Sequence, residues 1–253
     1  MKIALVQLAP VWENILYTQN NINDLLRTVS SGCNVLIFPE LTLTGFTMNS
    51  RKFANEKDGY SIKYFSNLAL SRKTAIIAGL IFRQEEHFYN SIVHFTPDGE
   101  IKSIYRKIHP FSYSGEHRHY KSGNATVSAR IGEFKAGLSI CYDLRFPELF
   151  RIYAKKRAEV IINIANWPFE RIQHWKSLAI ARAIENQCYF VGVNRTGIDK
   201  GNIYSGNRLV VDPLGNILLE LDDKEQVAEF EISRMSVIQT RTKLPFLNDI
   251  KLI

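Results

Sequence analysis

The chain has 253 residues, of which 45% are hydrophobic and 23% are charged, and its formal net charge is +7. This is the composition of a globular protein, and the length allows one large domain or two smaller ones. No run approaches the roughly 20 apolar residues of a membrane-spanning helix, and no small-residue cleavage site follows the first apolar run. We therefore expect a cytoplasmic protein that has no membrane partner.

The excess of basic residues is compatible with a nucleic acid, a membrane surface or a small anion as partner. The tight basic run at residues 155–157 ends a predicted helix, where cations complement the helix dipole and face water. Arginines within residues 141–151 are better placed to meet a small anion. We expect no nucleic-acid partner, since such a role would require the salt-dependent affinity that phosphate contacts give.

The sequence gives little support for a disulfide or a metal site. The three cysteines, at positions 33, 141 and 188, are odd in number and lack the spacing of metal ligands. A His-X-His pair at positions 117 and 119 has no third ligand at a suitable spacing. We therefore expect no metal and no other cofactor.

Apolar patterns in the first half predict an α/β fold. The predicted strands span residues 2–8, 35–38, 75–82, 88–95 and 100–105, and the predicted helices span residues 14–29 and 61–73. The order strand, helix, strand is typical of α/β proteins. The turn at residues 96–99 joins the last two strands into a hairpin, so the sheet is expected to be mixed.

The second half repeats this plan. Its predicted strands span residues 134–140, 160–165, 189–194, 207–211, 216–221 and 226–232, and its predicted helices span residues 147–157 and 171–186. No linker separates the halves, so we expect a single domain over residues 1–253. Residues 235–253 have a mixed pattern, which we interpret as a C-terminal arm that docks on a partner subunit.

Three residues with reactive side chains each follow directly after a predicted strand: Glu40, Lys107 and Cys141. Taken singly, each has a structural explanation, as a carboxylate that caps a turn, a solvated lysine and a small buried thiol. Strand ends in a sheet-based fold converge on one crevice, however. Beside a helix N-terminus and an arginine, the thiolate of Cys141 would be favoured.

The chemistry of these three side chains is complementary. A carboxylate can take the proton of a thiol, the thiolate can attack a carbonyl carbon, and an ammonium group can stabilise the oxyanion that forms. No histidine follows a comparable strand end, which argues against a Cys-His mechanism. The pattern therefore predicts a hydrolase with a cysteine nucleophile.

The segments FPELTLTGF, YRKIHPF and SICYDLRFPELFR resemble the Glu, Lys and Cys signatures of the nitrilase superfamily of carbon-nitrogen hydrolases. The resemblance implies a four-layer αββα sandwich in which Glu40 is the general base, Lys107 stabilises the oxyanion and Cys141 is the nucleophile. It also implies that Glu116 supports the lysine and the substrate, where the alternative is a surface charge on a loop. The backbone N–H of Tyr142 is the expected second oxyanion donor.

Within this superfamily the chain is most similar to the ω-amidase branch, through CYDLRFPE, EHRHYKSGN and ARAIENQ. The resemblance implies hydrolysis of the terminal amide of a short α-keto acid such as 2-oxoglutaramate or 2-oxosuccinamate. It also implies a homodimer. Arg145 is the candidate for binding a substrate carboxylate, although it could instead pair with Asp143 or Glu148. Further expected pocket residues are Phe46, Tyr120, Trp167 and Arg195, where Trp167 could equally pack in the core.

Two other functions stay open at this point. One is hydrolysis of a different amide, an N-carbamoyl compound, a deaminated glutathione or a nitrile within the same superfamily. The other is a catalytically silent binding protein on the same fold, in which the thiol is unused.

Overall fold

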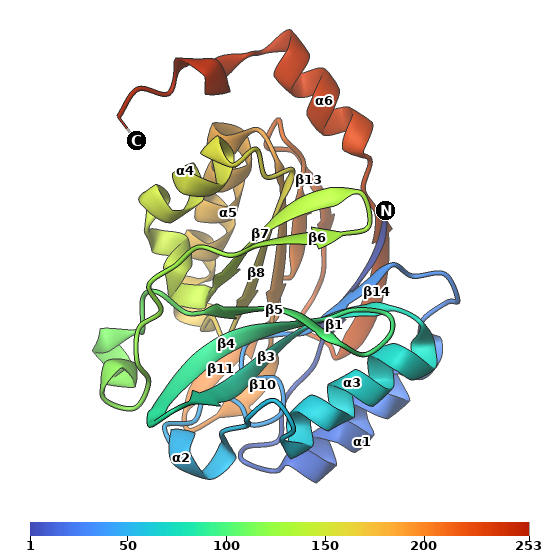
Figure 1. The fold of residues 1–253 in the computed structure, drawn as a ribbon, viewed down its shortest axis with the longest axis vertical. Coiled ribbons are helices and arrows are strands. Elements are labelled where there is room, and N and C mark those ends of the chain that lie inside the picture. The colour runs from blue at the N-terminus through green and yellow to red at the C-terminus, as the bar shows by residue number, and fades with distance from the viewer. Residues whose placement is uncertain (253) are drawn as a thin grey trace.

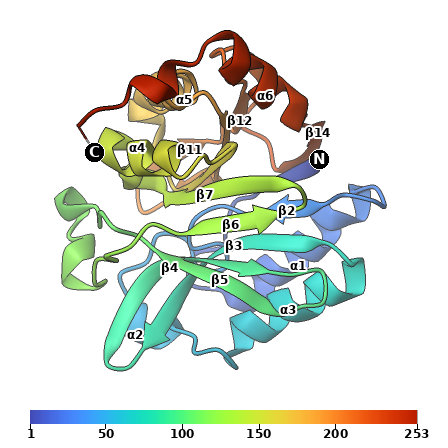
Figure 2. The same ribbon diagram turned by 45° about the horizontal axis from the view of Figure 1, so that its top comes forward.

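The computed structural model describes residues 1–252, which form two six-stranded mixed sheets stacked face to face, with helices on both outer faces (Figures 1 and 2). The predicted four-layer αββα sandwich is confirmed. No helix in the described part of the chain is long and apolar enough to cross a membrane.

The first sheet has the strand order β14-β1-β2-β3-β4-β5. Its strands are β1 (Lys2–Gln7), β2 (Val35–Ile37), β3 (Ala75–Gln84), β4 (His87–Phe95), β5 (Ile101–Arg106) and β14 (Gln226–Glu231). Strands β1, β2 and β3 are parallel, whereas the pairs β3–β4, β4–β5 and β1–β14 are antiparallel. Strand β5 therefore runs in the same direction as β2, and the carboxyl ends of both lie at the same edge of the sheet.

The second sheet has the order β13-β12-β9-β8-β7-β6. Its strands are β6 (Ser128–Ile131), β7 (Phe134–Ile140), β8 (Val160–Ala165), β9 (Tyr189–Asn194), β12 (Leu209–Val211) and β13 (Ile217–Glu220). Strands β7, β8 and β9 are parallel, and the outer pairs are antiparallel. A separate hairpin consists of β10 (Thr196–Asp199) and β11 (Asn202–Ser205).

The long helices connect the parallel strands. The α-helices are α1 (Ile15–Leu25), α2 (Ser50–Phe53), α3 (Tyr60–Arg72), α4 (Pro147–Lys155), α5 (Ile172–Asn186) and α6 (Arg234–Lys243). Short 3₁₀ helices are η1 (Leu26–Thr28), η2 (Ser112–Ser114), η3 (Glu116–Arg118), η4 (Cys141–Arg145), η5 (Phe169–Arg171) and η6 (Phe246–Asp249). Because α1 and α3 follow β1 and β2, and α4 and α5 follow β7 and β8, the two halves have the same strand-helix order, as expected.

Three apolar layers hold the sandwich together. Inward-facing residues of both sheets, such as Leu5 and Leu138, form the central layer. Helices α1 and α3 cover the outer face of the first sheet, and α4 and α5 cover the outer face of the second. Alternate residues of the inner parallel strands face these different layers, which explains why β2 and β8 are buried along their whole length.

Several elements differ from the sequence-based expectations. Helix α2, strand β6 and the β10–β11 hairpin were not expected. The C-terminal segment, expected as an arm on a partner subunit, forms α6 and η6 and docks on its own chain, where the Arg241 guanidinium donates to the carbonyls of Ala158 and Gln187 at 2.5 and 2.9 Å. A contact of this segment with a second subunit stays a prediction.

Candidate active site

Glu40, Lys107 and Glu116 form a buried ion cluster between the two sheets. The Lys107 ammonium lies 2.8 Å from Oε1 of Glu40 and 2.9 Å from Oε2 of Glu116. The three side chains are at most 1% exposed. Glu40 follows β2 and Lys107 follows β5, so the parallel direction of these strands brings both to one edge of the first sheet. Glu116 comes from η3, in the loop that follows β5.

Two asparagines hold the carboxylates in place. The Asn90 side-chain amide, in the middle of β4, donates to Glu40 at 2.7 Å and to Glu116 at 2.8 Å. The backbone N–H of Asn166, directly after β8, donates to Oε2 of Glu40 at 2.8 Å. Each of the two sheets thus contributes a hydrogen-bond donor to Glu40. Because both partners donate to it, the Glu40 carboxylate is held in one orientation.

Cys141 lies at a sharp turn between β7 and η4. Its φ angle is +45°, in the left-handed region that residues with a Cβ rarely adopt. Such a conformation costs roughly 1–3 kcal/mol and is typical of functional sites. The next residue, Tyr142, is in the first turn of η4, where backbone N–H groups have no partner within the helix.

Burial and the neighbouring charges set the protonation of this site. Burial, together with the Glu40 carboxylate, raises the pKa of the Cys141 thiol well above its usual value, although Lys107 opposes this effect. The resting thiol is therefore protonated, and the expectation of a favoured thiolate is wrong. Burial lowers the pKa of Lys107, but the carboxylates of Glu116 and Glu40 outweigh burial and hold that pKa well above its ordinary value. Burial also raises the pKa of Glu116, against the effect of Lys107.

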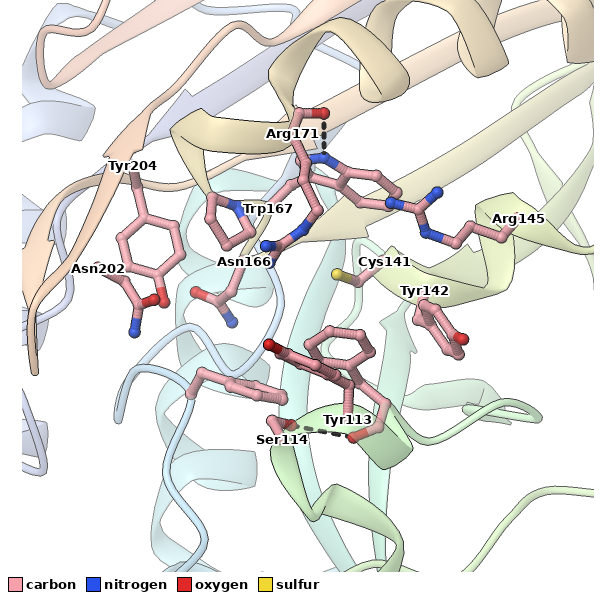
Figure 3. Close-up of a pocket in the computed structure, with 13 residues that line it drawn as sticks. Tyr113, Ser114, Cys141, Tyr142, Arg145, Asn166, Trp167, Arg171, Asn202 and Tyr204 are labelled. Atoms are coloured by element: carbon pink, nitrogen blue, oxygen red, sulfur yellow. Dashed lines mark hydrogen bonds between the residues drawn. The ribbon is translucent and has the colours of Figure 1, made fainter.

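A pocket of about 190 Å³ opens above the Cys141 sulfur (Figure 3). Figure 3 shows this sulfur pointing into the space that Tyr113, Asn166 and Arg171 surround. Among the described residues, no aspartate or glutamate lines this pocket. The lining residues are Phe46, Phe111, Tyr113, Ser114, Cys141, Tyr142, Arg145, Asn166, Trp167, Pro168, Arg171, Asn202 and Tyr204.

Four of the expected pocket residues line this cavity: Phe46, Tyr142, Arg145 and Trp167. The Arg145 guanidinium lies over the Trp167 indole, 4.8 Å from the ring centre, and Nη2 is 3.3 Å from Nδ1 of His174. The suggested pairing of Arg145 with Asp143 or Glu148 is absent among the ion pairs of the described residues.

Tyr120 and Arg195, which were expected in the pocket, do not line it. Tyr120 is buried in a separate apolar cluster, where its hydroxyl donates to the carbonyl of Thr47 at 2.6 Å. Arg195 is 1% exposed, forms an ion pair with Asp199 and lies over the Tyr204 ring. Both side chains therefore make structural contacts outside the pocket.

Several residues of the site were missed from the sequence. Asn90 gave no signal, because it lies inside a strand and not at its end. Asn166 has the same relation to β8 that Cys141 has to β7, so its strand-end position was an available signal. Arg171 lies over the Phe111 ring at 5.8 Å, and Tyr204 belongs to the unexpected β10–β11 hairpin.

The two other cysteines lie in the protein core and not in the pocket. Cys33 and Cys188 are buried, and burial raises the pKa of both thiols, for Cys188 to about 12. No group of three or more potential metal ligands occurs among the described residues.

Comparisons with known proteins point to one family. Residues 2–242 match the family model of carbon-nitrogen hydrolases. The chain is 34% identical to a 2-oxoglutaramate amidase of Bacillus subtilis, over 88% of this chain and 86% of the relative. It is 32% identical to the omega-amidase YafV of Escherichia coli K12, over 98% of this chain and 96% of the relative.

Solved structures give the same result. A CN-hydrolase superfamily protein from Xanthomonas campestris, which holds an arsenic adduct in its active site, superimposes with a TM-score of 0.94 at 28% identity. The match covers 100% of this chain and 98% of that one. Because the family model spans nearly the whole sequence, the chain belongs to the carbon-nitrogen hydrolase family.

Proposed function

We propose that this hydrolase releases ammonia from the terminal amide of a short 2-oxo acid, such as 2-oxoglutaramate or 2-oxosuccinamate. The observation that carries the proposal is the buried cluster of Glu40, Lys107 and Glu116 next to a thiol that opens into a pocket. Relatives named 2-oxoglutaramate amidase and omega-amidase, at 34% and 32% identity, support the choice of substrate.

In the first half-reaction, Glu40 takes the proton of the Cys141 thiol as the sulfur attacks the amide carbon. A base is required because the raised pKa of Cys141 keeps the resting thiol protonated. The oxyanion is stabilised by the Lys107 ammonium and the backbone N–H of Tyr142. Collapse of the tetrahedral intermediate breaks the C–N bond, and Glu40 returns its proton to the leaving nitrogen, which departs as ammonia.

In the second half-reaction, water hydrolyses the thioester. Glu40 takes a proton from the water, whose oxygen attacks the thioester carbon, and the same two donors stabilise the second oxyanion. The C–S bond then breaks, the sulfur recovers the proton from Glu40, and the 2-oxo dicarboxylic acid leaves. Glu116 keeps the Lys107 ammonium in position throughout, because it contacts Nζ through both carboxylate oxygens, at 3.2 and 2.9 Å.

The pocket favours a substrate that carries a carboxylate. Arg145 and Arg171 line it, and no acidic side chain of the lining opposes them. Hydrogen bonds between a guanidinium and a carboxylate are among the stronger ones in proteins. An aromatic wall, which includes Phe46, Phe111 and Trp167, leaves room for a short carbon chain between the thiol and the arginines.

The test is a panel assay of ammonia release with 2-oxoglutaramate, 2-oxosuccinamate, glutamine, asparagine, an N-carbamoyl compound, deaminated glutathione and simple nitriles. We expect turnover of the two 2-oxo acid amides by the wild type and none by Cys141→Ala. The matched control is Cys188→Ala, which removes a buried thiol outside the pocket and keeps turnover. Turnover by Cys141→Ala would refute the mechanism, and preference for another compound would refute the substrate.

We also propose that the chain is one catalytic domain that acts as a cytoplasmic homodimer. The shared central layer between the two sheets supports a single domain. Apolar side chains that remain exposed on the C-terminal segment, such as Met235 and Phe246, support a contact with a second subunit.

A further inference from the structure

Asp143, two residues after Cys141, is fully buried and accepts hydrogen bonds on both oxygens. The hydroxyl of Tyr105 and the backbone N–H of Ile140 donate to Oδ2 at 2.7 and 3.0 Å. The backbone N–H of His109 donates to Oδ1 at 3.0 Å, and the ring Nδ1 of His109 lies 2.8 Å from the same oxygen. Four donors thus converge on one buried carboxylate.

These donors come from both sheets. Ile140 is the last residue of β7, directly before Cys141. Tyr105 lies in β5, two residues before Lys107, and His109 follows Lys107 by two residues. The Asp143 carboxylate therefore connects the turn that holds Cys141 to the strand end that holds Lys107.

A second polar link between the sheets runs from Lys107 through Glu40 to the backbone N–H of Asn166, and it does not include the turn at Cys141. Strand β5 is at the edge of the first sheet and pairs with β4 alone, so only one side of it is held by a strand partner. The layer between the sheets is apolar, and apolar contacts are not directional. Hydrogen bonds to a buried carboxylate are directional and strong, and they specify one arrangement.

The same carboxylate holds the strained turn. Cys141 keeps its φ of +45° only if the surroundings enforce it. The bond from the Ile140 N–H to Asp143 closes over Cys141 and Tyr142, which contribute the thiol and the expected oxyanion N–H. The His109 ring, which is fixed by Asp143, stacks on Phe146 with 3.8 Å between ring centres, and so anchors the end of η4.

We propose that Asp143 is a positioning residue that sets the placement of the Cys141 thiol relative to the Lys107 ammonium. This inference rests on the proposed function, in which sulfur attack and oxyanion stabilisation need both groups at one carbonyl. Displacement of a catalytic group by about 1 Å can lower a rate on the order of 10²-fold.

The first test is Asp143→Asn, which keeps the side-chain shape. Whichever way the amide is oriented, its NH2 group faces a backbone N–H, that of Ile140 or that of His109, and at least one bond is lost. We expect kcat to fall on the order of 10²-fold, with KM near the wild-type value. The control is Asp212→Asn, since Asp212 also accepts from two backbone N–H groups, of Leu214 and Asn216, in the turn between β12 and β13. A kcat for Asp143→Asn equal to that of this control would overturn the proposal.

The second test is independent of any substrate. The rate of alkylation of Cys141 by iodoacetamide, followed against pH, reports the pKa of the thiol, which Lys107 lowers. If the ammonium moves away in Asp143→Asn, the alkylation midpoint shifts to higher pH. Loss of the Asp143 charge alone would shift it to lower pH, so a lower or unchanged midpoint contradicts the positioning role.

Tyr105→Phe covers the case in which Asp143→Asn does not fold. It removes one donor and leaves the other three, so we expect the same two changes with smaller size. An unchanged kcat and midpoint in a folded Tyr105→Phe would contradict the role. If the wild type turns over no amide of the panel, the proposed function fails, while the alkylation midpoints still decide the role of Asp143.

Discussion

Lys107 is the one cation of the buried cluster and pairs with two carboxylates. Its ammonium contacts Glu40 and Glu116, and the three side chains are fully buried. A buried charge without a partner is strongly unfavourable, so the cluster is stable only as a unit. The side chain that would stabilise the oxyanion is therefore also the cation that keeps the general base and Glu116 in place.

Lys107→Met should separate these two roles. Loss of one oxyanion donor is expected to lower kcat by roughly 10²–10³-fold. Without the ammonium that lowers it, the pKa of Glu116 should rise further above that of the unfolded chain. A carboxyl whose pKa is raised by folding is stabilising at low pH, and this stability is lost as pH rises through the folded pKa.

The measurement is urea unfolding of Lys107→Met between pH 5 and 8, together with kcat for ammonia release. Relative to wild type, the variant should lose stability as pH rises across this range. Lys63→Met, an exposed lysine on α3, is the control and should keep the wild-type pH dependence. A pH-independent stability difference would show that Glu116 takes up no proton when Lys107 is lost.

Arg145 and Arg171 lead to a prediction about binding. We expect Arg145→Gln and Arg171→Gln each to raise KM for 2-oxoglutaramate about 10-fold or more, since a charge-assisted hydrogen bond contributes about 1.5–3 kcal/mol. For a neutral amide without a carboxylate, the KM of both variants should stay near the wild-type value. Arg51→Gln is the control, because Arg51 lies over the Phe88 ring at 5.6 Å, much as Arg171 lies over Phe111, but outside the pocket. Equal losses with the neutral amide would argue against carboxylate binding.

Sequence patterns predicted the helices and strands whose buried residues recur periodically or form a continuous run. Strand β8 is apolar at five of its six positions and was found at its observed bounds. Helix α4 begins at Pro147, whose fixed φ suits the first helical turn. Helix α2 has only four residues, which is too short for a helical period to be visible. The strands of the β10–β11 hairpin have four residues each, and their mixed burial lacks the alternation of a half-buried strand.

In the active site, the residues at strand ends were predictable from the sequence, and their tertiary partners were not. Glu40, Lys107 and Cys141 each follow a strand, so the rule that strand ends converge was enough to group them. The partners that tune them are set by tertiary contacts. Asn90 is 50 residues from Glu40 in sequence, and Asn166 is 126 residues from it. The pKa of Cys141 depends on this burial, which explains why the local sequence led to the wrong protonation state.

Strand β4 carries a buried histidine outside the site, and it gives a prediction of pH-dependent stability. His94 is 2% exposed, and burial, with a smaller effect of Lys102, lowers its pKa to about 4 from 6.5. Between these values the unfolded chain binds a proton that the folded chain does not. The free energy of unfolding therefore falls as pH drops from about 6.5 to 4, by about 3 kcal/mol from this residue.

His94→Gln should remove this part of the acid sensitivity. We expect the variant to gain stability relative to wild type as pH falls from 7 to 4.5, as measured by urea unfolding at several pH values. His117→Gln, at an exposed position, is the control and should follow the wild-type curve. Parallel curves for wild type and His94→Gln would refute the assignment to His94.

At the scale of the whole molecule, the two halves share one apolar layer and one site. Each half contributes a parallel strand-helix unit, and the site lies where their strand ends meet. The C-terminal segment closes the sandwich at the side of α4 and α5, with Val237 of α6 buried against the central layer (Figure 1). The Arg241 guanidinium anchors the C-terminal segment by donating to the carbonyls of Ala158, after α4, and Gln187, after α5.

The outward side of this segment gives the last prediction. Ile238 and Phe246 remain 42% and 61% exposed although they are apolar, as expected for residues that a second subunit covers. If the segment forms the dimer interface, the double variant Ile238→Glu, Phe246→Glu should elute as a single chain in size-exclusion chromatography, while the wild type elutes at about twice the mass of one chain. Leu16→Glu is the control, since Leu16 is 64% exposed on α1, which covers the opposite face of the sandwich. A dimeric double variant would place the interface elsewhere, and a monomeric wild type would refute the homodimer, because exposed apolar side chains are then simply solvated.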